Sequence, residues 1–256
     1  MNSFSKSFVT KRVNTNDLWK WKSFNGWISD ISVNSFNNFA AIGTSGTVHG
    51  WDKPLKRWRE YPGGKKGGLS LTIMGNDEVF VCFATTIERF IPDKNERFKG
   101  RWIKIPGCCK DIDSDGFGLL VVVGCDKHQF GFGIWRNLGG NYNNWKRLLG
   151  QAVRIGVGSR GHIVVSNNKK DIFWKDSWDK VWQKVPGKAH DVTVSVGGRI
   201  VVIGTDQHIW ASSTEGYRAQ FQQNNGMGYR VSCWNWRFPM VVGMDHAAWR
   251  AELPKV

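Results

Sequence analysis

The sequence predicts an all-β protein, a six-bladed β-propeller whose blades are four-stranded antiparallel sheets and whose ring is closed by the N-terminal strand. Two observations lead to this prediction. A unit of about forty residues recurs along the chain, and no segment shows the period of an amphipathic helix. A unit of four short strands cannot bury both faces of its sheet alone, so neighbouring units must pack on each other. We expect residues 1–256 to form one domain without a linker.

Each unit is anchored by an aromatic residue that is followed five positions later by glycine. The anchors are Trp21, Trp58, Trp102, Trp145, Trp182 and Phe221, and the glycines are Gly26, Gly63, Gly107, Gly150, Gly187 and Gly226. A large flat ring at one position of every unit can fill the wedge between twisted neighbouring sheets. We therefore expect the anchors to serve packing, and the 30 glycines to mark tight turns with positive φ.

The ends of the chain predict how the ring closes. After its anchor, each unit continues with an apolar strand, a tight turn and a last strand that holds an aromatic residue. The sixth unit ends at the Trp249 strand and lacks the anchored strand that follows the other last strands. The strand around Trp19-Lys20-Trp21 can supply it, and this pairing would remove an exposed sheet edge. Residues 1–16 would then form an extra edge or stay mobile.

Charge narrows the class of partner. The chain carries 36 Lys and Arg against 21 Asp and Glu, a net charge of +15, which favours a partner with phosphates or carboxylates. The basic residues are scattered rather than arranged in a stripe, so nucleic acid ranks last among such partners. No apolar run is long enough to cross a bilayer.

Cysteine content and the N-terminal residues bear on localisation. The five cysteines match no zinc motif, and the adjacent Cys108 and Cys109 are not expected to pair with each other. The N-terminal residues contain no apolar run of signal-peptide length. We therefore expect a cytoplasmic protein, or one exported without a signal peptide.

The sequence contains no recognisable catalytic or metal-binding motif. His-x-x-x-His, Cys-x-x-Cys and Gly-x-Ser-x-Gly are all absent. Asp111, Asp113 and Asp115 alternate as in a calcium loop, but the glycine and glutamate of such a loop are missing. We expect these three to be one turn residue and solvent-facing acids. The prediction is a protein that is not an enzyme and has no cofactor or metal.

The fifth unit carries the clearest pattern: Val181-Trp182-Gln183-Lys184-Val185-Pro186-Gly187, then Asp191-Val192-Thr193-Val194-Ser195-Val196-Gly197-Gly198, then His208-Ile209-Trp210. This unit resembles the tectonin repeat, Trp-x-x-Val-Pro-Gly, Asp-Val-Ser-Val-Gly and an Ile-Tyr/Trp-Arg strand. The resemblance covers residues 18–250. The second unit departs from it by lacking the Asp, and the sixth by having Phe221 and Arg230. It implies a fold similar to six-bladed lectins for lipopolysaccharide, N-acetylated sugars or O-methylated glycans; other members are membrane-trafficking adaptors.

Candidate ligand-binding residues lie on the last strand of each unit and the first strand of the next. Sugar recognition needs an aromatic face and a few well-placed polar groups. The aromatic candidates are Trp51, Phe90, Trp135, Trp174, Trp210 and Trp249; the basic neighbours are Arg136, Lys175 and Arg250; the acids are Asp30, Asp111 and Asp191. We expect shallow pockets between adjacent blades, with packing alone as the alternative role of these residues.

The predicted function is multivalent carbohydrate binding: a lectin of innate defence for cell-surface or microbial glycans, with lipopolysaccharide and methylated sugars among the candidates. Several weak sites on one rigid ring would gain avidity by engaging one surface together. Two alternatives stay open: an intracellular scaffold for protein interactions, and non-specific nucleic-acid binding through basic loops. The sequence leaves the oligomeric state and any peripheral contact with glycan-bearing surfaces undecided.

Overall fold

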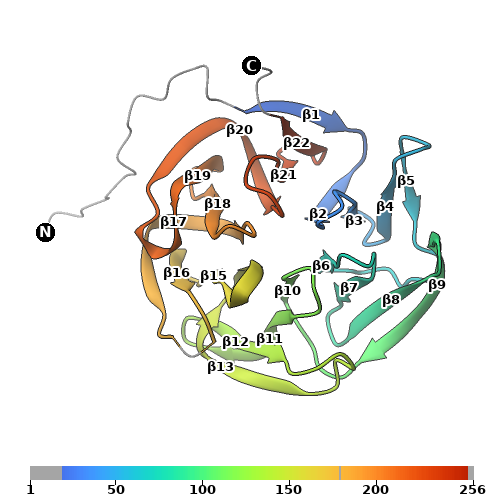
Figure 1. Ribbon diagram of the computed structural model, residues 1–256, viewed down its shortest axis with the longest axis horizontal. Helices are drawn as coiled ribbons and strands as arrows, with labels where there is room; N and C mark the ends of the chain where they lie inside the picture. Colours follow the sequence, from blue (N-terminus) through green and yellow to red (C-terminus); the bar gives the residue numbers. More distant parts are fainter. Residues whose placement is uncertain (1–18, 179, 253–256) are drawn as a thin grey trace, which may run out of the picture.

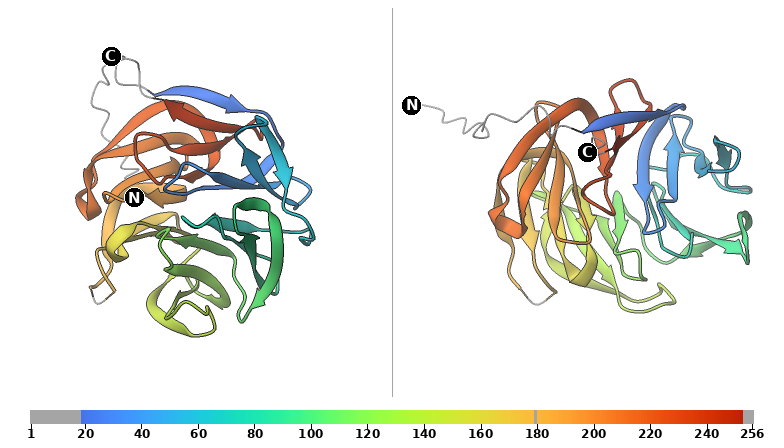
Figure 2. Two further views of the ribbon diagram at one scale, coloured as in Figure 1. Left: turned by 45° about the vertical axis from the view of Figure 1, so that its right-hand side comes forward. Right: turned by 45° about the horizontal axis from the view of Figure 1, so that its top comes forward.

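A computed structural model describes residues 19–178 and 180–252, which form strands joined by turns and loops. The predicted all-β class and its four-stranded antiparallel sheets are confirmed. The sheets stand side by side around one axis (Figure 1), and the oblique views of Figure 2 show the same arrangement. The described residues include two short 3-10 helices, η2 (Ser159–Gly161) and η3 (Gly216–Arg218), and no helix that is long and apolar enough to span a membrane. The predicted role of residues 1–16 lies outside the described residues.

Strands β2 to β13 form three separate four-stranded sheets. The first comprises β2 (Ile28–Val33), β3 (Phe39–Gly43), β4 (Val48–Asp52) and β5 (Arg57–Glu60). The second comprises β6 (Ser70–Ile73), β7 (Val79–Cys82), β8 (Ile87–Asp93) and β9 (Glu96–Ile105). The third comprises β10 (Asp111–Ser114), β11 (Leu120–His128), β12 (Gly131–Asn137) and β13 (Trp145–Ala152). We call each such radial group of four strands a blade and name it by its first and last strands.

The remaining strands form one ten-stranded run, from β14 through β22 to β1. They are β14 (Arg154–Val157), β15 (Ile163–Ser166), β16 (Asp171–Lys175), β17 (Gln183–Val194), β18 (Arg199–Gly204), β19 (His208–Glu215), β20 (Phe221–Ser232), β21 (Met240–Gly243), β22 (Ala248–Glu252) and β1 (Lys20–Phe24). The first half of β17 pairs with β16 and its second half with β18, and β20 bridges β19 and β21 in the same way. The run therefore repeats the four-strand order of the separate blades.

The anchor tryptophans join consecutive blades. Trp145 Nε1 donates to Pro106 O at 2.8 Å, and Trp21, Trp102 and Trp182 donate in the same way to Asn225 O, Pro62 O and Leu149 O. Every acceptor directly precedes a repeat glycine of the preceding blade, and all six repeat glycines have positive φ. The recurrent aromatic–glycine pair thus arises because the indole of one blade packs on the glycine turn of the blade before it.

The glycine turn is testable at Gly150, whose φ is +107° and whose Cβ, if present, would lie 2.7 Å from Trp182 Nε1. Gly150→Ala should lower the free energy of unfolding by about 2 kcal/mol or more, because it adds backbone strain to a steric clash. Gly139→Ala is the matched control, since a Cβ there meets nothing within 4 Å. Urea unfolding measures both; equal stability of the two variants would contradict the packing role.

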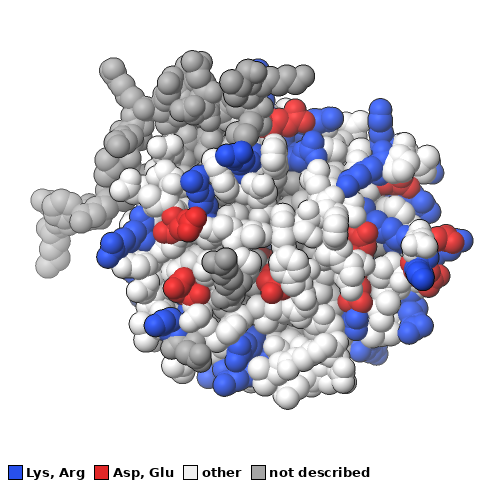
Figure 3. Space-filling model, viewed as in Figure 1, with Lys and Arg blue, Asp and Glu red and all other residues white. Residues whose placement is uncertain are grey.

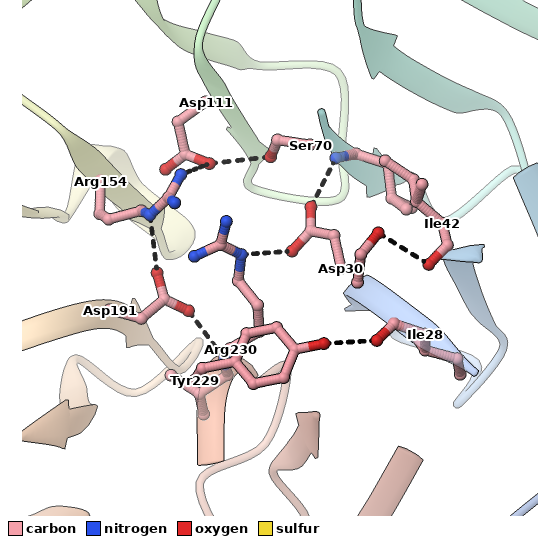
Figure 4. A network of polar contacts seen from close by, with 12 residues as sticks. Ile28, Asp30, Ile42, Ser70, Asp111, Arg154, Asp191, Tyr229 and Arg230 are labelled. Carbon is pink, nitrogen blue, oxygen red and sulfur yellow. Dashed lines mark hydrogen bonds and ion pairs between the residues drawn. The ribbon is translucent and has the colours of Figure 1, made fainter. Parts of the chain in front are cut away.

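A belt of polar side chains surrounds the axis (Figure 4). Its members occupy corresponding positions on the axis-facing strands, and they are Asp30, Ser70, Asp111, Arg154, Asp191 and Arg230. Arg154 lies 3.5 Å from Asp111 and 3.7 Å from Asp191, and Arg230 lies 3.3 Å from Asp30. Ser70 Oγ donates to Asp111 Oδ1 at 2.8 Å. The belt therefore alternates acids with cations or a hydroxyl donor.

Each belt aspartate also reaches into the next blade. Leu71 N–H donates to Asp30, Ile155 N–H to Asp111 and Val231 N–H to Asp191, at 2.7–2.9 Å. Burial raises the pKa of Asp30 to about 6, although Arg230 opposes the shift. Burial also raises the pKa of Asp191, against the effect of Arg230 and Arg154. Ser70, Arg154 and Arg230 stand where the repeat has Asp, and each of them is a partner for a neighbouring belt aspartate.

A second layer lies one strand step further along the axis, around Asp113. Its carboxylate accepts the N–H of Val157 at 2.7 Å and the hydroxyl of Thr72 at 3.2 Å, and it borders the small central cavity. The expectation that Asp111 and Asp113 face solvent is therefore wrong, because the first strand of each blade points its side chains at the axis. Asp115 is the turn residue of the three: it accepts the N–H groups of Phe117 and Leu119.

Asp113 predicts a pH dependence of stability. Burial raises its pKa to about 7 from 3.8, so between about pH 4 and pH 7 the folded chain holds a proton that the unfolded chain has released. The protonated Asp113 carboxyl therefore contributes to the free energy of unfolding below this window, and the contribution is lost as the pH rises through it. Asn keeps an acceptor for Val157 and does not ionise, so Asp113→Asn should melt about 5 °C above wild type at pH 8 and close to it at pH 5. Calorimetry showing the same difference at both pH values would contradict this.

Four cysteines form two disulfides that the sequence did not predict. Cys82 on β7 is bonded to Cys109, and Cys108 is bonded to Cys125 on β11, while Cys233 is a free, buried thiol. The adjacent Cys108 and Cys109 thus pair with different strands. Together the two bonds tie the connection between β9 and β10 to the blades on either side of it.

Candidate functional site

The described cavities with room for a ligand lie at the seams between neighbouring blades. In an antiparallel blade, the first-to-second and third-to-fourth connections share one rim, and the other connections share the opposite rim. Two cavities lie at the first rim: the Trp174 pocket of 490 Å³ and the Trp51 pocket of 340 Å³. Two lie at the opposite rim: the Trp249 pocket of 330 Å³ and the Phe173 pocket of 200 Å³.

The Trp174 pocket lies between the β14–β17 and β17–β20 blades. Trp174 forms its floor, only 2% exposed, with its ring centroid 5.0 Å from that of His162. His162 Nε2 lies 3.3 Å from Asp176 Oδ1, and Tyr217 adds a second, half-buried aromatic ring. The other side chains that line the pocket are Lys180, Val181, Gln183, Glu215 and Arg218.

The loop around η3 forms one wall of this pocket. Gly216 has a φ of +70°, and its N–H donates to Gly198 O at 3.1 Å, which holds the loop against the neighbouring connection. Thr214 Oγ1 donates to Arg218 O at 3.0 Å and closes the loop. A Cβ on Gly216 would lie 3.5 Å from Trp174 Nε1, so the loop backbone lies directly beside the indole. Glycine at this position therefore permits the narrow wall.

The chemistry of the Trp174 pocket suits a polyhydroxylated ligand. It combines two aromatic rings with an amide, carboxylates and a guanidinium, which can accept from and donate to neighbouring hydroxyls. Asp176, Glu215 and Arg218 are exposed, so these groups can reach a ligand without being desolvated first. No nucleophile–base pair is assembled among the described residues that line it.

The pockets of the opposite rim are more apolar. An anchor tryptophan and a third-strand aromatic face each of them: Trp21 with Trp249, and Trp182 with Phe173. The Trp249 pocket is completed by methionines 227 and 244 and by the aliphatic side chains of Ile209 and Val241. Apolar walls of this kind accept methyl groups more readily than hydroxyls.

The six aromatic residues that the sequence groups together lie at three different positions. In four blades the second strand has a valine at the same position, and the residue opposite this valine on the third strand can be compared. It is Trp135, Trp210 or Trp249 in three of these blades. In the β14–β17 blade it is Phe173, not Trp174. In the β2–β5 and β6–β9 blades the corresponding residues are His49 and Glu88, so Trp51 and Phe90 lie two residues further on. Trp174 lies one residue further on, and a shift of one residue turns a side chain to the other face.

Three of these aromatic residues are held within their own blades. Trp135, Trp210 and Trp249 donate their indole N–H groups at 3.1–3.3 Å to aspartates that precede them in the same blade; the acceptors are Asp126, Asp206 and Asp245. Phe90 is fully buried and Trp210 is 4% exposed. Of the six, Trp51, Trp174 and Trp249 line the four pockets.

The predicted basic and acidic partners lie away from these pockets. Arg136 lies over Trp178 at 4.6 Å, Lys175 over Trp182 at 5.5 Å and Arg250 over Phe24 at 5.7 Å from the ring centroids. Asp30, Asp111 and Asp191 belong to the axial belt, because the first strand of a blade faces the axis. None of these six residues lines one of the four pockets.

Sequence reasoning missed the residues that give the Trp174 pocket its polar walls. They are His162, Asp176, Gln183, Glu215, Tyr217 and Arg218. Asp176, Tyr217 and Arg218 come from the connections after Trp174 and after Trp210, which are long compared with the short turn between β8 and β9. That extra length is the signal in the sequence that could have found the site.

Comparisons with known proteins establish the fold. No protein-family model and no curated protein matches the chain. Among solved structures, the gluconolactonase XC5397 from Xanthomonas campestris is 10% identical and has a TM-score of 0.66, covering 93% of this chain and 92% of that one. The WD40 β-propeller domain of Doa1 is 14% identical with a TM-score of 0.59, covering 93% and 97%. YCF48 bound to a D1 peptide is 12% identical with a TM-score of 0.57, covering 96% and 99%.

These likenesses show that the chain is a β-propeller, and at such low identity they show the fold alone. Propellers are often used for protein interaction. None of the three structures named above is described as a lectin or a tectonin.

Proposed function

We propose that this protein is a non-catalytic, multivalent lectin of the tectonin type that binds glycans in pockets between its blades. The observation that carries the proposal is the Trp174 pocket, where aromatic rings and several hydroxyl-binding side chains converge in 490 Å³. A sugar ring has an apolar face and hydroxyl groups around its edge. The rings of Trp174 and Tyr217 match the apolar face, and the donors and acceptors around them match the hydroxyls.

We also infer that the ring has six blades and is closed by the N-terminal strand. Support comes from the ten-stranded run, which divides into three blades if β17 and β20 are each shared between two of them. Further support comes from β1, which pairs antiparallel with β22 from Lys20↔Glu252 to Phe24↔Ala248 and takes the place of a fourth strand.

Multivalency follows from the presence of two pockets on each rim of the ring, because two pockets on the same rim can face one surface together. Several weak sites that engage one surface together raise avidity by roughly 10²–10⁴ when the geometry permits. Microbial or cell-surface glycans, including lipopolysaccharide, present such repeated ligands. The apolar Trp249 and Phe173 pockets suit methylated sugars in particular.

Catalysis is not part of the proposal. The likeness to a gluconolactonase rests on 10% identity and carries no activity to this chain. Of the two locations that the sequence leaves open, the disulfides Cys82–Cys109 and Cys108–Cys125 favour export, because disulfides persist in oxidising surroundings.

A protein-interaction scaffold is the second candidate, and exposed aromatic residues on the first-to-second strand connections favour it. Phe36, Phe117 and Phe238 are 67%, 72% and 41% exposed. Trp234 packs edge-on against Phe117 at 5.3 Å beside the central cavity. A pull-down dominated by one protein and insensitive to competing sugars would favour this function over the first.

A glycan array tests the lectin function with two variants of the Trp174 pocket. Tyr217→Ala should remove the stacking surface and Gln183→Ala a planar polar group, each weakening glycan binding about tenfold. Gln222→Ala is the matched control, because Gln222 is exposed and lies outside the four pockets. The proposal fails if wild type binds no glycan above background, or if all three variants bind as wild type does.

A further inference from the structure

The Trp51 pocket differs from the other three in its charge. It lies between the β2–β5 and β6–β9 blades, where the β4–β5 connection faces the β8–β9 hairpin. Four cations line it, namely Lys53, Arg59, Arg97 and Lys99, against the two acids Asp52 and Glu96. On the face drawn in Figure 3, Lys and Arg lie mainly around the outer edge of the molecule.

Arg97 is a fixed positive charge in the wall of this pocket. Its Nη1 donates to Trp51 O at 2.9 Å and its Nη2 to Phe39 O at 2.8 Å, both neutral acceptors. Among the described residues it forms an ion pair with Asp77, whose Oδ1 lies 3.6 Å from Nε and also accepts from Asn34 and Asn38. The guanidinium is therefore held in place while its charge is only partly balanced.

Lys53 is an exposed residue that lines the pocket, and no carboxylate of the part of the chain that the structure describes forms an ion pair with its ammonium group. Its one hydrogen bond among the described residues is to the carbonyl oxygen of Phe36, at 2.9 Å, which leaves N–H groups for a ligand. Burial and the nearby charges of Arg97 and Arg250 lower its pKa, against the effect of Asp77. Lys53 thus lies in a local excess of positive charge that an anion would relieve.

Aromatic rings complete the pocket. Trp51 is half-buried, and Phe98 lies under two guanidinium groups, with Arg59 at 4.5 Å and Arg97 at 5.3 Å from its ring centroid. Arg59 Nη1 donates to Asp52 at 3.0 Å, and the Arg59 side chain is more than two-fifths exposed. Its second terminal nitrogen, Nη2, can therefore donate to a ligand. An aromatic wall beside unbalanced cations is the combination that an acidic sugar needs.

We propose that the Trp51 pocket binds the oxyanion of an acidic saccharide, a sulfate or a carboxylate on the sugar ring, with Lys53 as the contacting cation. The inference that the ligand is a saccharide rests on the proposed lectin function, whereas the inference that it carries an oxyanion rests on the charges of the pocket itself. Lys53 and Arg59 donate to the oxyanion, Arg97 supplies a fixed field behind it, and the sugar ring lies against Trp51. This seam therefore takes a different class of glycan from the uncharged ligands that suit the Trp249 and Phe173 pockets.

The test must separate this site from the overall charge of +15, which attracts any polyanion. Lys53→Gln and Lys104→Gln lower the net charge equally, and Lys104 is an exposed residue of β9 outside the pocket. The probe is a heparin hexasaccharide, with its desulfated form as reference, titrated calorimetrically at 150 mM salt. Lys53→Gln should weaken binding at least tenfold and Lys104→Gln less than twofold, with Lys53→Arg close to wild type. Equal losses in the two Gln variants would overturn the proposal.

Measurements with neutral glycans distinguish this proposal from the lectin function. Lys53→Gln should leave any Gln183-dependent binding of neutral glycans unchanged, because the two residues lie in different seams. Loss of neutral binding in Lys53→Gln with an unchanged melting temperature would contradict separate sites. A chain that binds the heparin fragment through Lys53 but no neutral glycan would contradict the lectin function at Trp174 and leave the oxyanion site standing.

Discussion

The belt of buried charges around the axis is the constraint on which the rest of the structure depends. Ionisable side chains can be buried together only if each finds a partner, because an unbalanced charge in the interior costs several kcal/mol. In the belt, Arg154, Arg230 and the Ser70 hydroxyl are the partners of the three aspartates, and each aspartate also accepts an N–H from the next blade. These contacts cross the seams, so they fix how each blade lies against its neighbour.

The outer part of each seam is held by a different interaction. There the anchor indole of one blade packs on the glycine turn of the blade before it. Trp21, Trp102, Trp145 and Trp182 also donate to the carbonyl that precedes the glycine. With both ends of the seam held, the connections at the rims are free to vary in length and chemistry. The Trp174 and Trp51 pockets share a rim and a construction, yet one is lined by hydroxyl-binding groups and the other by cations.

The sequence predicts the fold well because the two residues of the outer seam contact, the anchor and the glycine, recur in the repeat. Each unit carries an anchor and a glycine at a fixed spacing, and the structure shows the anchor tryptophans meeting the glycine turn of the blade before them. The belt was not predictable in the same way: Ser70, Arg154 and Arg230 read as lost aspartates until the blades are closed around a common axis. Alternation along a strand does not say which face meets the axis, so the sequence alone does not place Asp113 there.

The candidate site was predicted less well, for physical reasons. Turn lengths between the second and third strands vary, so the grouping of Trp174 with Trp210 was off by one residue, and one residue decides the face. The polar walls of the Trp174 pocket come from two loops that are distant in sequence and lie together only after the blades pack. The disulfides likewise depend on distances between strands, which spacing along the chain does not give.

The most direct test of the belt is the free energy of unfolding of Asp191→Ala, measured by urea titration. Removing this carboxylate leaves Arg154 and Arg230 short of an anion and the N–H of Val231 without its acceptor. We expect a loss of about 3–5 kcal/mol, against about 0.5 kcal/mol or less for Asp176→Ala at the exposed rim. A loss below about 1 kcal/mol in Asp191→Ala would show that the blades hold together without the belt and would contradict this account.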